Sequence, residues 1–248
     1  MYYAESMSTR FAEVAGAAPS SAGSTQKFSG TNVQEQGVDE ADIFKTDGDY
    51  IYTSSGRTLF ITNTGEDAEL LSRTDVEMNV QGLFLADEHL IVIGSEYQGY
   101  NGDFAARSMI WPGYRSSDML IHIYDISDPE NPQRVKEVES EGYYVDARMK
   151  DGVAYIISNS GVSYDQPIPL IREDGVEKAI AADRIAYFPG HYDDVQMTTV
   201  HTLDLASLDL SSDAVLTDST NTVYMDEYLY LSSTSYVNEW SIRQDLML

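Results

Sequence analysis

The stretch KTDGDYIYTSSG (Lys45–Gly56) contains the pattern on which the fold depends. An Asp-Gly pair comes near its start, a run of aromatic and branched residues follows, and small polar residues end it. Asp-Gly favours a tight hairpin turn, and a run of Tyr and Ile suits a strand that is buried on both faces. The stretch therefore predicts a hairpin turn that leads into a buried β-strand.

The same pattern recurs in three further stretches: LADEHLIVIGSE (Leu85–Glu96), MKDGVAYIISNS (Met149–Ser160) and YMDEYLYLSSTS (Tyr224–Ser235). All four stretches share an aspartate at the third position: Asp47, Asp87, Asp151 and Asp226. A strand-like piece precedes each turn, and after the first three a third strand and a more polar fourth strand follow. In IHIYDISDPENP (Ile121–Pro132) the third strand ends at a turn that holds two prolines. Each repeat thus predicts four antiparallel strands.

The spacing of the repeats supports this interpretation. Asp47 and Asp87 are 40 residues apart, which is a usual length for a four-stranded propeller blade. The next two intervals are 64 and 75 residues, and the excess matches two insertions, Tyr97–Ser117 and Gly161–Val195. Both insertions fall between the second and third strands of a repeat, so we expect them to emerge on the same face of the molecule.

We predict an all-β fold, a β-propeller of four-stranded antiparallel blades with three complete blades and a partial fourth. A flexible lead-in is expected over residues 1–30, and the partial propeller domain over residues 31–248. The expected blades cover approximately residues 38–77, 78–141, 142–219 and 220–248. A β-sandwich is the main alternative, although a sandwich does not require a four-strand period.

One known family is similar to this chain. TNVQEQGVDEADIFKTDGDYIY (Thr31–Tyr52) resembles the opening motif of secreted archaeal and bacterial β-propeller-domain proteins, which are distantly related to WD-type repeats. IYDISDPENPQRVKEVE (Ile123–Glu139) is similar to that family's blade-closing phrase, and the stretch Asp165–Gly190 looks like its long insertion. The resemblance runs from Thr31 to the end of the chain. It implies an extracellular or cell-surface location, and it supplies no catalytic residues because the family is largely of unknown function.

The resemblance also concerns the number of blades. Relatives in that family continue for several more blades, so we expect this chain to be a fragment of a larger ring or to need further blades from the same or another polypeptide. A half-ring would leave one blade face bare, which is a large apolar patch that monomers rarely tolerate.

Charge excludes several classes of partner. The chain has 41 acidic and 15 basic residues, which give a formal net charge of −26. This field repels nucleic acid and anionic membranes, so no nucleic-acid partner is expected. An acidic surface of this kind suits salty surroundings, where salt screens self-repulsion, and bound divalent cations are the alternative reason for it.

Two absences in the sequence complete these expectations. There is no cysteine, which excludes disulfides and thiolate metal sites. No apolar run reaches 18 residues and the N-terminus lacks the regions of a signal peptide, so the chain as given is not expected to be transmembrane.

An acidic motif at the start of the first blade is the candidate metal site. Asp39, Glu40 and Asp42 lie within four residues, and calcium prefers six to eight oxygen ligands from carboxylates and carbonyls. The alternative is a structural role for these acids, with a buried aspartate that accepts backbone hydrogen bonds. Calcium is the one cofactor that the sequence suggests.

Two histidines occupy the same repeat position. His122 lies in IHIYD and His201 in VHTLD. A residue that recurs at one place in successive blades favours a packing role over a catalytic one.

The first insertion is the candidate ligand-binding loop. It combines aromatic residues with arginines, a composition that favours recognition of sugars, peptides or proteins. The alternative is that this loop packs over its own blade. The candidate ligand-binding residues are Tyr97, Tyr100, Arg107, Trp111, Tyr114 and Arg115.

Two functions follow from these candidates. The first is a non-enzymatic binding or scaffold propeller that recognises a protein or polysaccharide through its inserted loops. The second is a propeller hydrolase, with or without an assisting metal, that uses carboxylates such as those of Asp39, Glu40 and Asp42. No nucleophile elbow, phosphate loop or dinucleotide motif occurs, so the sequence favours a protein that is not an enzyme.

Overall fold

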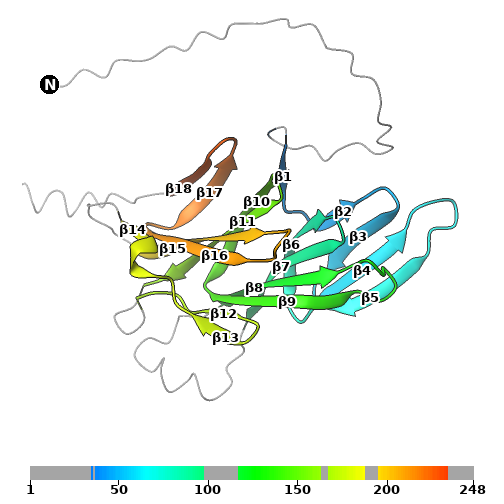
Figure 1. The fold of residues 1–248 in the computed structure, drawn as a ribbon, viewed down its shortest axis with the longest axis horizontal. Coiled ribbons are helices and arrows are strands. Elements are labelled where there is room, and N and C mark those ends of the chain that lie inside the picture. Colours follow the sequence, from blue (N-terminus) through cyan, green and yellow to red (C-terminus); the bar gives the residue numbers. More distant parts are fainter. Residues whose placement is uncertain (1–34, 36, 98–116, 163–166, 188–194, 234–248) are drawn as a thin grey trace, which may run out of the picture.

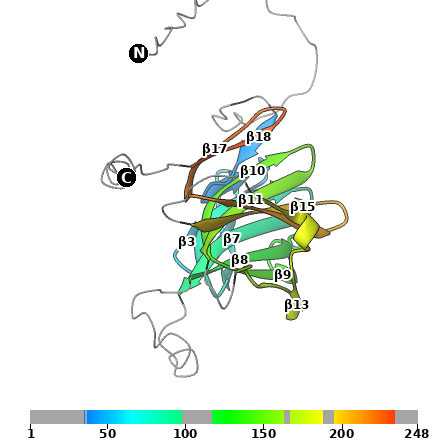
Figure 2. The same cartoon turned by 90° about the vertical axis from the view of Figure 1, so that its left-hand side faces the viewer.

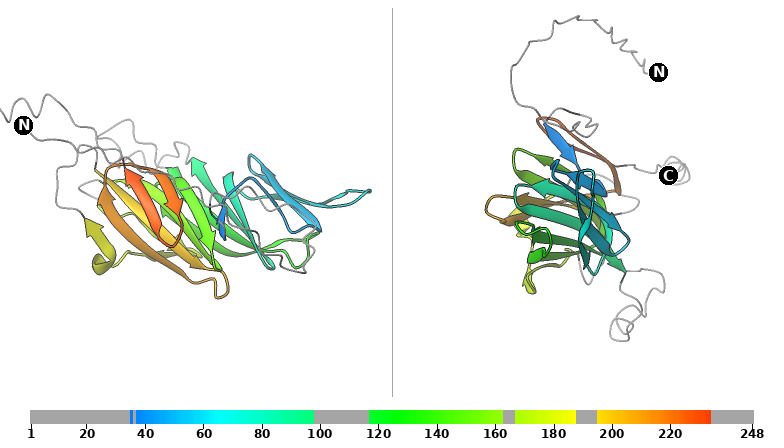
Figure 3. Two further views of the ribbon diagram at one scale, coloured as in Figure 1. Left: turned by 90° about the horizontal axis from the view of Figure 1, so that it is seen from above. Right: turned by 90° about the vertical axis from the view of Figure 1, so that its right-hand side faces the viewer.

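A computed structural model describes Glu35 and residues 37–97, 117–162, 167–187 and 195–233 of the chain. In these residues almost all regular structure is β-strand, and the one helical piece is the 3-10 turn η1 (Ala182–Arg184). The strands form four sheets that follow one another along the molecule in chain order (Figure 3). The prediction of an all-β propeller fold is confirmed.

The first blade is a four-stranded antiparallel meander, in which each strand pairs with the next. Its strands are β2 (Phe44–Thr46), β3 (Tyr50–Ser55), β4 (Thr58–Asn63) and β5 (Leu70–Asp75). The second blade repeats this order with longer strands. They are β6 (Asn79–Ala86), β7 (His89–Tyr97), β8 (Ser117–Asp125) and β9 (Gln133–Glu141).

The third blade has the same four-strand order, and the fourth contributes one hairpin. The third-blade strands are β10 (Tyr143–Lys150), β11 (Val153–Gly161), β15 (Gln196–Asp204) and β16 (Leu210–Thr217). The hairpin consists of β17 (Thr220–Met225) and β18 (Leu229–Ser233). Strand β17 lies beside β10 (Figure 2), so the innermost strands of these two blades are neighbours.

The four repeated aspartates occupy equivalent places. Each lies in the turn between the first and second strands of its blade. Asp47 accepts hydrogen bonds from the backbone N–H groups of Asp49 and Tyr50, and Asp226 accepts one from that of Tyr228. Asp87 and Asp151 have φ angles of 48° and 51°. Aspartate recurs because its carboxylate can cap the turn and because it tolerates a left-handed backbone better than most residues.

The core lies between the blades. In β7, Leu90 and Val92 face the first blade, whereas Ile91 and Ile93 face the third, and all four side chains are fully buried. Alternate residues of one strand therefore serve two separate apolar layers. This arrangement explains why the second strand of each repeat is an unbroken apolar run.

Four short strands extend the blades at their edges (Figure 1). Strand β1 (Val38–Glu40) pairs with the inner edge of β10, so it belongs to the sheet of the third blade rather than the first. From the second insertion, β12 (Ile171–Glu173) and β13 (Val176–Lys178) form a hairpin on the outer edge of β9. Strand β14 (Ile185–Tyr187) pairs in parallel with β16. The insertion thereby connects the outer edges of two blades.

Candidate functional site

Both long insertions leave their blades at the same end. The first begins and ends at the paired residues Tyr97 and Ser117, and the second at Gly161 and Gln196. These pairs lie at the strand ends opposite the aspartate turns, where short linkers also join one blade to the next. We call this side of the molecule the connection face. The expectation that both insertions emerge on one face agrees with these anchor points.

The predicted ligand-binding loop is largely outside the described part of the chain. Tyr97 is the last residue of β7, and its backbone position opposite Ser117 is known. The other predicted residues lie outside the described residues: Tyr100, Arg107, Trp111, Tyr114 and Arg115. A binding role for this loop therefore stays a prediction.

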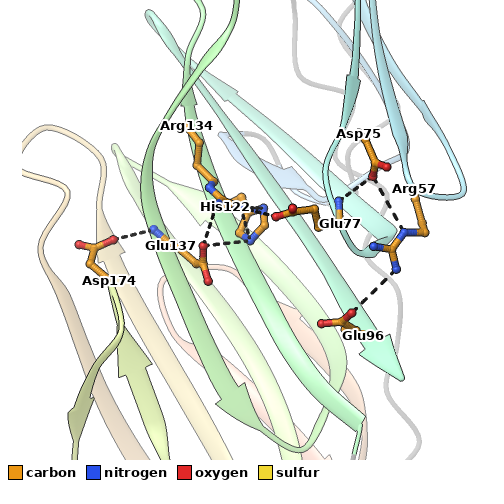
Figure 4. Close-up of polar contacts among 8 residues, drawn as sticks. All are labelled: Arg57, Asp75, Glu77, Glu96, His122, Arg134, Glu137 and Asp174. Atoms are coloured by element: carbon orange, nitrogen blue, oxygen red, sulfur yellow. Dashed lines mark hydrogen bonds and ion pairs between the residues drawn. The ribbon is translucent and has the colours of Figure 1, made fainter. Parts of the chain in front are cut away.

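A group of charged residues joins the first two blades beside the base of the first insertion (Figure 4). We call it the seam cluster, and it consists of Arg57, Asp75, Glu77, Glu96, His122, Arg134 and Glu137. Arg57 lies 4.0 Å from both Asp75 and Glu96, so it connects the first blade to the end of β7. Arg134 donates to Glu77 at 3.0 Å and lies 3.2 Å from Glu137. The cluster alternates positive and negative groups across the junction between blades.

His122 is the buried member of the seam cluster, with its side chain only 2% exposed (Figure 4). The Arg134 guanidinium lies 3.5 Å from both ring nitrogens, and a Glu137 oxygen lies 3.9 Å from Nε2. Burial, with a further contribution from Arg134, lowers the pKa of His122 to about 4, although Glu77 acts in the opposite direction. The ring is therefore neutral near pH 7 and inaccessible to a substrate. These are properties of a packing residue, as its repeat position predicted.

His201 has the equivalent place between the second and third blades. Its ring is fully buried, and its two nitrogens lie 3.2 Å from Ser158 Oγ and 3.0 Å from Ser212 Oγ. A hydroxyl can donate or accept, so this pair satisfies a neutral imidazole in either tautomer. Burial lowers the pKa of His201 to about 4. The second histidine is thus also a neutral, hydrogen-bonded core residue.

The structure places the three predicted calcium ligands in different surroundings. Asp39 binds the Lys45 ammonium through both carboxylate oxygens, at 2.7 and 2.8 Å. Glu40 lies 3.6 Å from Arg148, and Asp42 accepts a hydrogen bond from the backbone N–H of Ile43. Among the described residues, no three His, Asp or Glu side chains gather in a way that could hold a metal ion. Calcium binding stays a prediction, and any ion at Asp39 would have to compete with Lys45.

Sequence reasoning missed the two cations that hold these acids. Lys45 and Arg148 are each only 6% exposed. Their signal in the sequence was their rarity, because the chain has 15 basic residues against 41 acidic ones. A long cationic side chain inside a strand of such a protein is expected to have an acidic partner.

Two surface hollows complete the described features. One of about 250 Å³ lies beside the seam cluster and is lined by charged residues that include Arg134, Lys136, Glu137 and Asp174. The other, of about 330 Å³, lies at the outer part of the third blade next to the ion pair of Arg184 and Asp213. The named ionisable groups in both hollows already have partners, since Lys136 binds Glu173 and Asp174 binds the backbone of Glu137. Neither hollow presents a free pair of carboxylates for hydrolysis.

Successive four-stranded meanders that pack face to face, with their first strands innermost, define a protein of the β-propeller class. The chain belongs to the beta propeller domain family, whose model matches residues 28–246. In the part of the chain that the structure describes, no helix has both the length and the apolar character needed to cross a membrane.

Two archaeal relatives are uncharacterised proteins. One, from Methanocaldococcus jannaschii, is 31% identical over 143 residues, which cover 58% of this chain and 19% of that protein. The other, from Archaeoglobus fulgidus, is 27% identical over 232 residues, which cover 86% of this chain and 33% of that protein. The chain thus matches only a fifth to a third of the length of these relatives. No solved structure matches the chain.

Proposed function

We propose that this protein is a non-enzymatic binding or scaffold propeller that acts outside the cell or at its surface. Its partner would be a protein or a polysaccharide, recognised through the insertions of the second and third blades. The observation that carries the proposal is the common origin of both insertions at the connection face, anchored at Tyr97 with Ser117 and at Gly161 with Gln196. Loops held at adjacent places by rigid sheets are a common way to build a recognition surface.

The chemistry of the described residues supports binding over catalysis. The two buried histidines are neutral and already hydrogen-bonded or packed, and Asp39 is paired with Lys45. A hydrolase would need two carboxylates, or a metal and a carboxylate, that converge on one open position. In the first insertion, Trp111 and Arg115 are the residues that we expect to contact the partner.

The test is a binding screen against glycan and protein arrays with the full chain. We expect the double variant Trp111→Ala/Arg115→Ala to lose at least about tenfold in affinity, since aromatic and arginine side chains dominate binding energy. A matched control is Tyr228→Ala, which removes an exposed aromatic side chain (68% exposed) from the aspartate turn of the fourth blade, on the side opposite the connection face. Its affinity and the thermal unfolding of both variants should equal those of the wild type.

Two results would overturn the proposal. The first is a ligand that binds the double variant and the wild type equally well. The second is hydrolysis of an arrayed substrate that stops with a chelator and returns with calcium, which would favour the metal-assisted hydrolase.

A further inference from the structure

One short segment of the chain contacts the innermost strand of every blade. We call it the crossing segment, and it consists of Glu35 and residues 37–42. It begins at the fourth blade, where Tyr224 of β17 donates to Glu35 at 2.6 Å. It then pairs with β10 of the third blade as β1. Asp42 next forms a backbone bridge to Leu83 in β6 of the second blade, and the chain continues into β2 of the first.

Lys45 holds this segment in place. Its ammonium donates to both oxygens of Asp39 and, at 2.7 Å, to the carbonyl oxygen of Glu40. The same ammonium lies 5.5 Å from the ring centroid of Phe84 in β6. One buried cation of the first blade thus binds the crossing segment and contacts the second blade. Because Lys45 is only 6% exposed, loss of its carboxylate partner would leave a buried charge without compensation.

Arg148 has the corresponding role between the third and fourth blades. Its guanidinium lies 3.6 Å from Glu40 of the crossing segment. It also donates to Asp146 at 2.7 Å and to the carbonyl oxygen of Val223 in β17 at 3.2 Å. The segment is therefore held by two cations that bind the neighbouring residues Asp39 and Glu40 of β1.

The second blade has a glycine where the crossing segment passes. A Cβ atom at Gly82 would lie 2.7 Å from the Cβ of Ala41, which is closer than two carbon atoms can approach. Gly82 has no positive φ angle, so the backbone conformation does not require glycine here. What requires it is the close passage of Ala41.

We propose that the crossing segment is a latch that locks the inner edges of the second, third and fourth blades in one arrangement. The ion pair of Asp39 with Lys45 keeps the latch closed. When it opens, the inner edges of β6 and β10 lose their backbone partners in the same event. The four blades are then joined by their apolar faces, their linkers and the polar contacts outside the crossing segment, such as those of the seam cluster.

Hydrogen exchange of the full-length chain at neutral pH tests this proposal. We expect Asp39→Asn to accelerate exchange about tenfold in the peptides that contain Leu83 and Arg148–Lys150, although neither peptide includes the substituted residue. Gly82→Ala should accelerate exchange in residues 37–42 and in Arg148–Lys150, because it displaces the segment sterically. The hairpin β3–β4 has no hydrogen bond or ion pair to the crossing segment among the described residues, so it is the internal reference and should not change.

An engineered disulfide between β1 and β10, which can be formed and reduced, is the matched control. Val38 and Lys150 lie opposite each other in the register of β1 and β10, and the chain has no cysteine of its own. The variant Val38→Cys/Lys150→Cys can therefore form one defined disulfide, with its reduced form as the reference. We expect oxidation to slow exchange at Leu83 in the Asp39→Asn background, and also with Asp39 intact should Asp39→Asn fail to fold.

Two outcomes would overturn the proposal. In the first, Asp39→Asn and Gly82→Ala accelerate exchange only at the residues next to each substitution. In the second, the oxidised disulfide leaves exchange at Leu83 equal to that of the reduced form. Either outcome would mean that the crossing segment does not couple the inner edges of the blades to one another.

Discussion

Two histidines show how single residues support the packing of blades. His122 and His201 occupy the same place on the third strands of successive blades, and each faces the preceding blade. Their rings fill space between sheets and remain neutral, because burial in an apolar layer disfavours the imidazolium ion. Such a residue makes the stability of the fold depend on pH.

The direction of this dependence follows from linkage. Folding lowers the pKa of both histidines from the ordinary value of 6.5 to about 4. Below pH 6.5 the unfolded chain binds protons that the folded chain does not, so the free energy of unfolding decreases as the pH falls from 6.5 towards 4. Each histidine should lower the free energy of unfolding at pH 5 by about 2 kcal/mol relative to its value at pH 7.5.

Urea unfolding at pH 7.5 and pH 5 measures this effect. The variants His122→Gln and His201→Gln should each show a smaller loss of stability between these pH values than the wild type. An equal loss in the wild type and in both variants would mean that other groups are responsible for it.

At the scale of elements, each junction between blades combines an apolar layer with a polar margin. Between the first and second blades, the apolar layer contains Tyr52, Leu59 and Leu90, and the seam cluster forms the margin. The hairpin β12–β13 adds a second kind of connection at the outer edge of β9. There Glu173 binds both Lys136 and Lys178, and Lys136 also donates to the carbonyl oxygen of Leu208.

Removal of Arg134 tests the seam cluster. Arg134→Ala should lower the free energy of unfolding by about 1 kcal/mol, because it breaks two partly exposed ion pairs. A double-mutant cycle with Glu77→Gln should give a coupling energy of about 0.5 kcal/mol. The control is Arg73→Ala, which removes an exposed arginine that lies over the Phe60 ring of the first blade.

Chemical denaturation of the five proteins, namely the wild type, the two single variants, the double variant and the control, provides these values. We expect the control to change stability by less than about 0.5 kcal/mol. If Arg73→Ala lowers the free energy of unfolding as much as Arg134→Ala does, the ion pairs of the seam cluster stabilise the fold no more than an ordinary exposed arginine.

At the scale of the whole molecule, the main features are the large negative charge and the two outermost blades, whose outer faces have no neighbouring blade among the described residues. In the described residues the four sheets form an open row. Large apolar side chains are exposed near both of its ends: Ile43 and Phe44 at the first blade, and Tyr228 and Tyr230 at the fourth. Neighbouring blades of a larger ring could cover these side chains, and the presence of further blades stays a prediction.

Net charge predicts a response to salt. A protein with a charge of −26 repels itself, and about 1 M salt shortens the Debye length to about 3 Å. We therefore expect the unfolding temperature to rise by about 5 °C between 0.1 and 1 M sodium chloride. Thermal unfolding followed by circular dichroism measures the rise.

A charge-reversal variant is the control for this response. Glu66 and Asp67 are exposed residues of the turn between β4 and β5. Their replacement by lysine changes the net charge by +4, from −26 to −22, and should make the rise smaller. A fall in unfolding temperature with added salt would instead show that surface ion pairs outweigh self-repulsion.

The sequence by itself determined the blades. Turn residues such as Asp47 and Asp151 and the apolar runs after them are local signals, because a tight turn and a buried strand depend on neighbours within a dozen residues. The places of both insertions and the packing role of the repeated histidines followed from the same periodicity.

Only the tertiary structure decided what the acidic motif contacts. The sequence predicts Asp39 and Glu40 as candidate calcium ligands next to the first blade. In the structure β1 pairs with β10 of the third blade, where Asp39 binds Lys45 of the first blade and Glu40 lies near Arg148 of the third. A strand of three residues has no periodicity from which its partner could be predicted. Its place depends on contacts between residues more than a hundred positions apart, which arise only when the blades stand around a common axis.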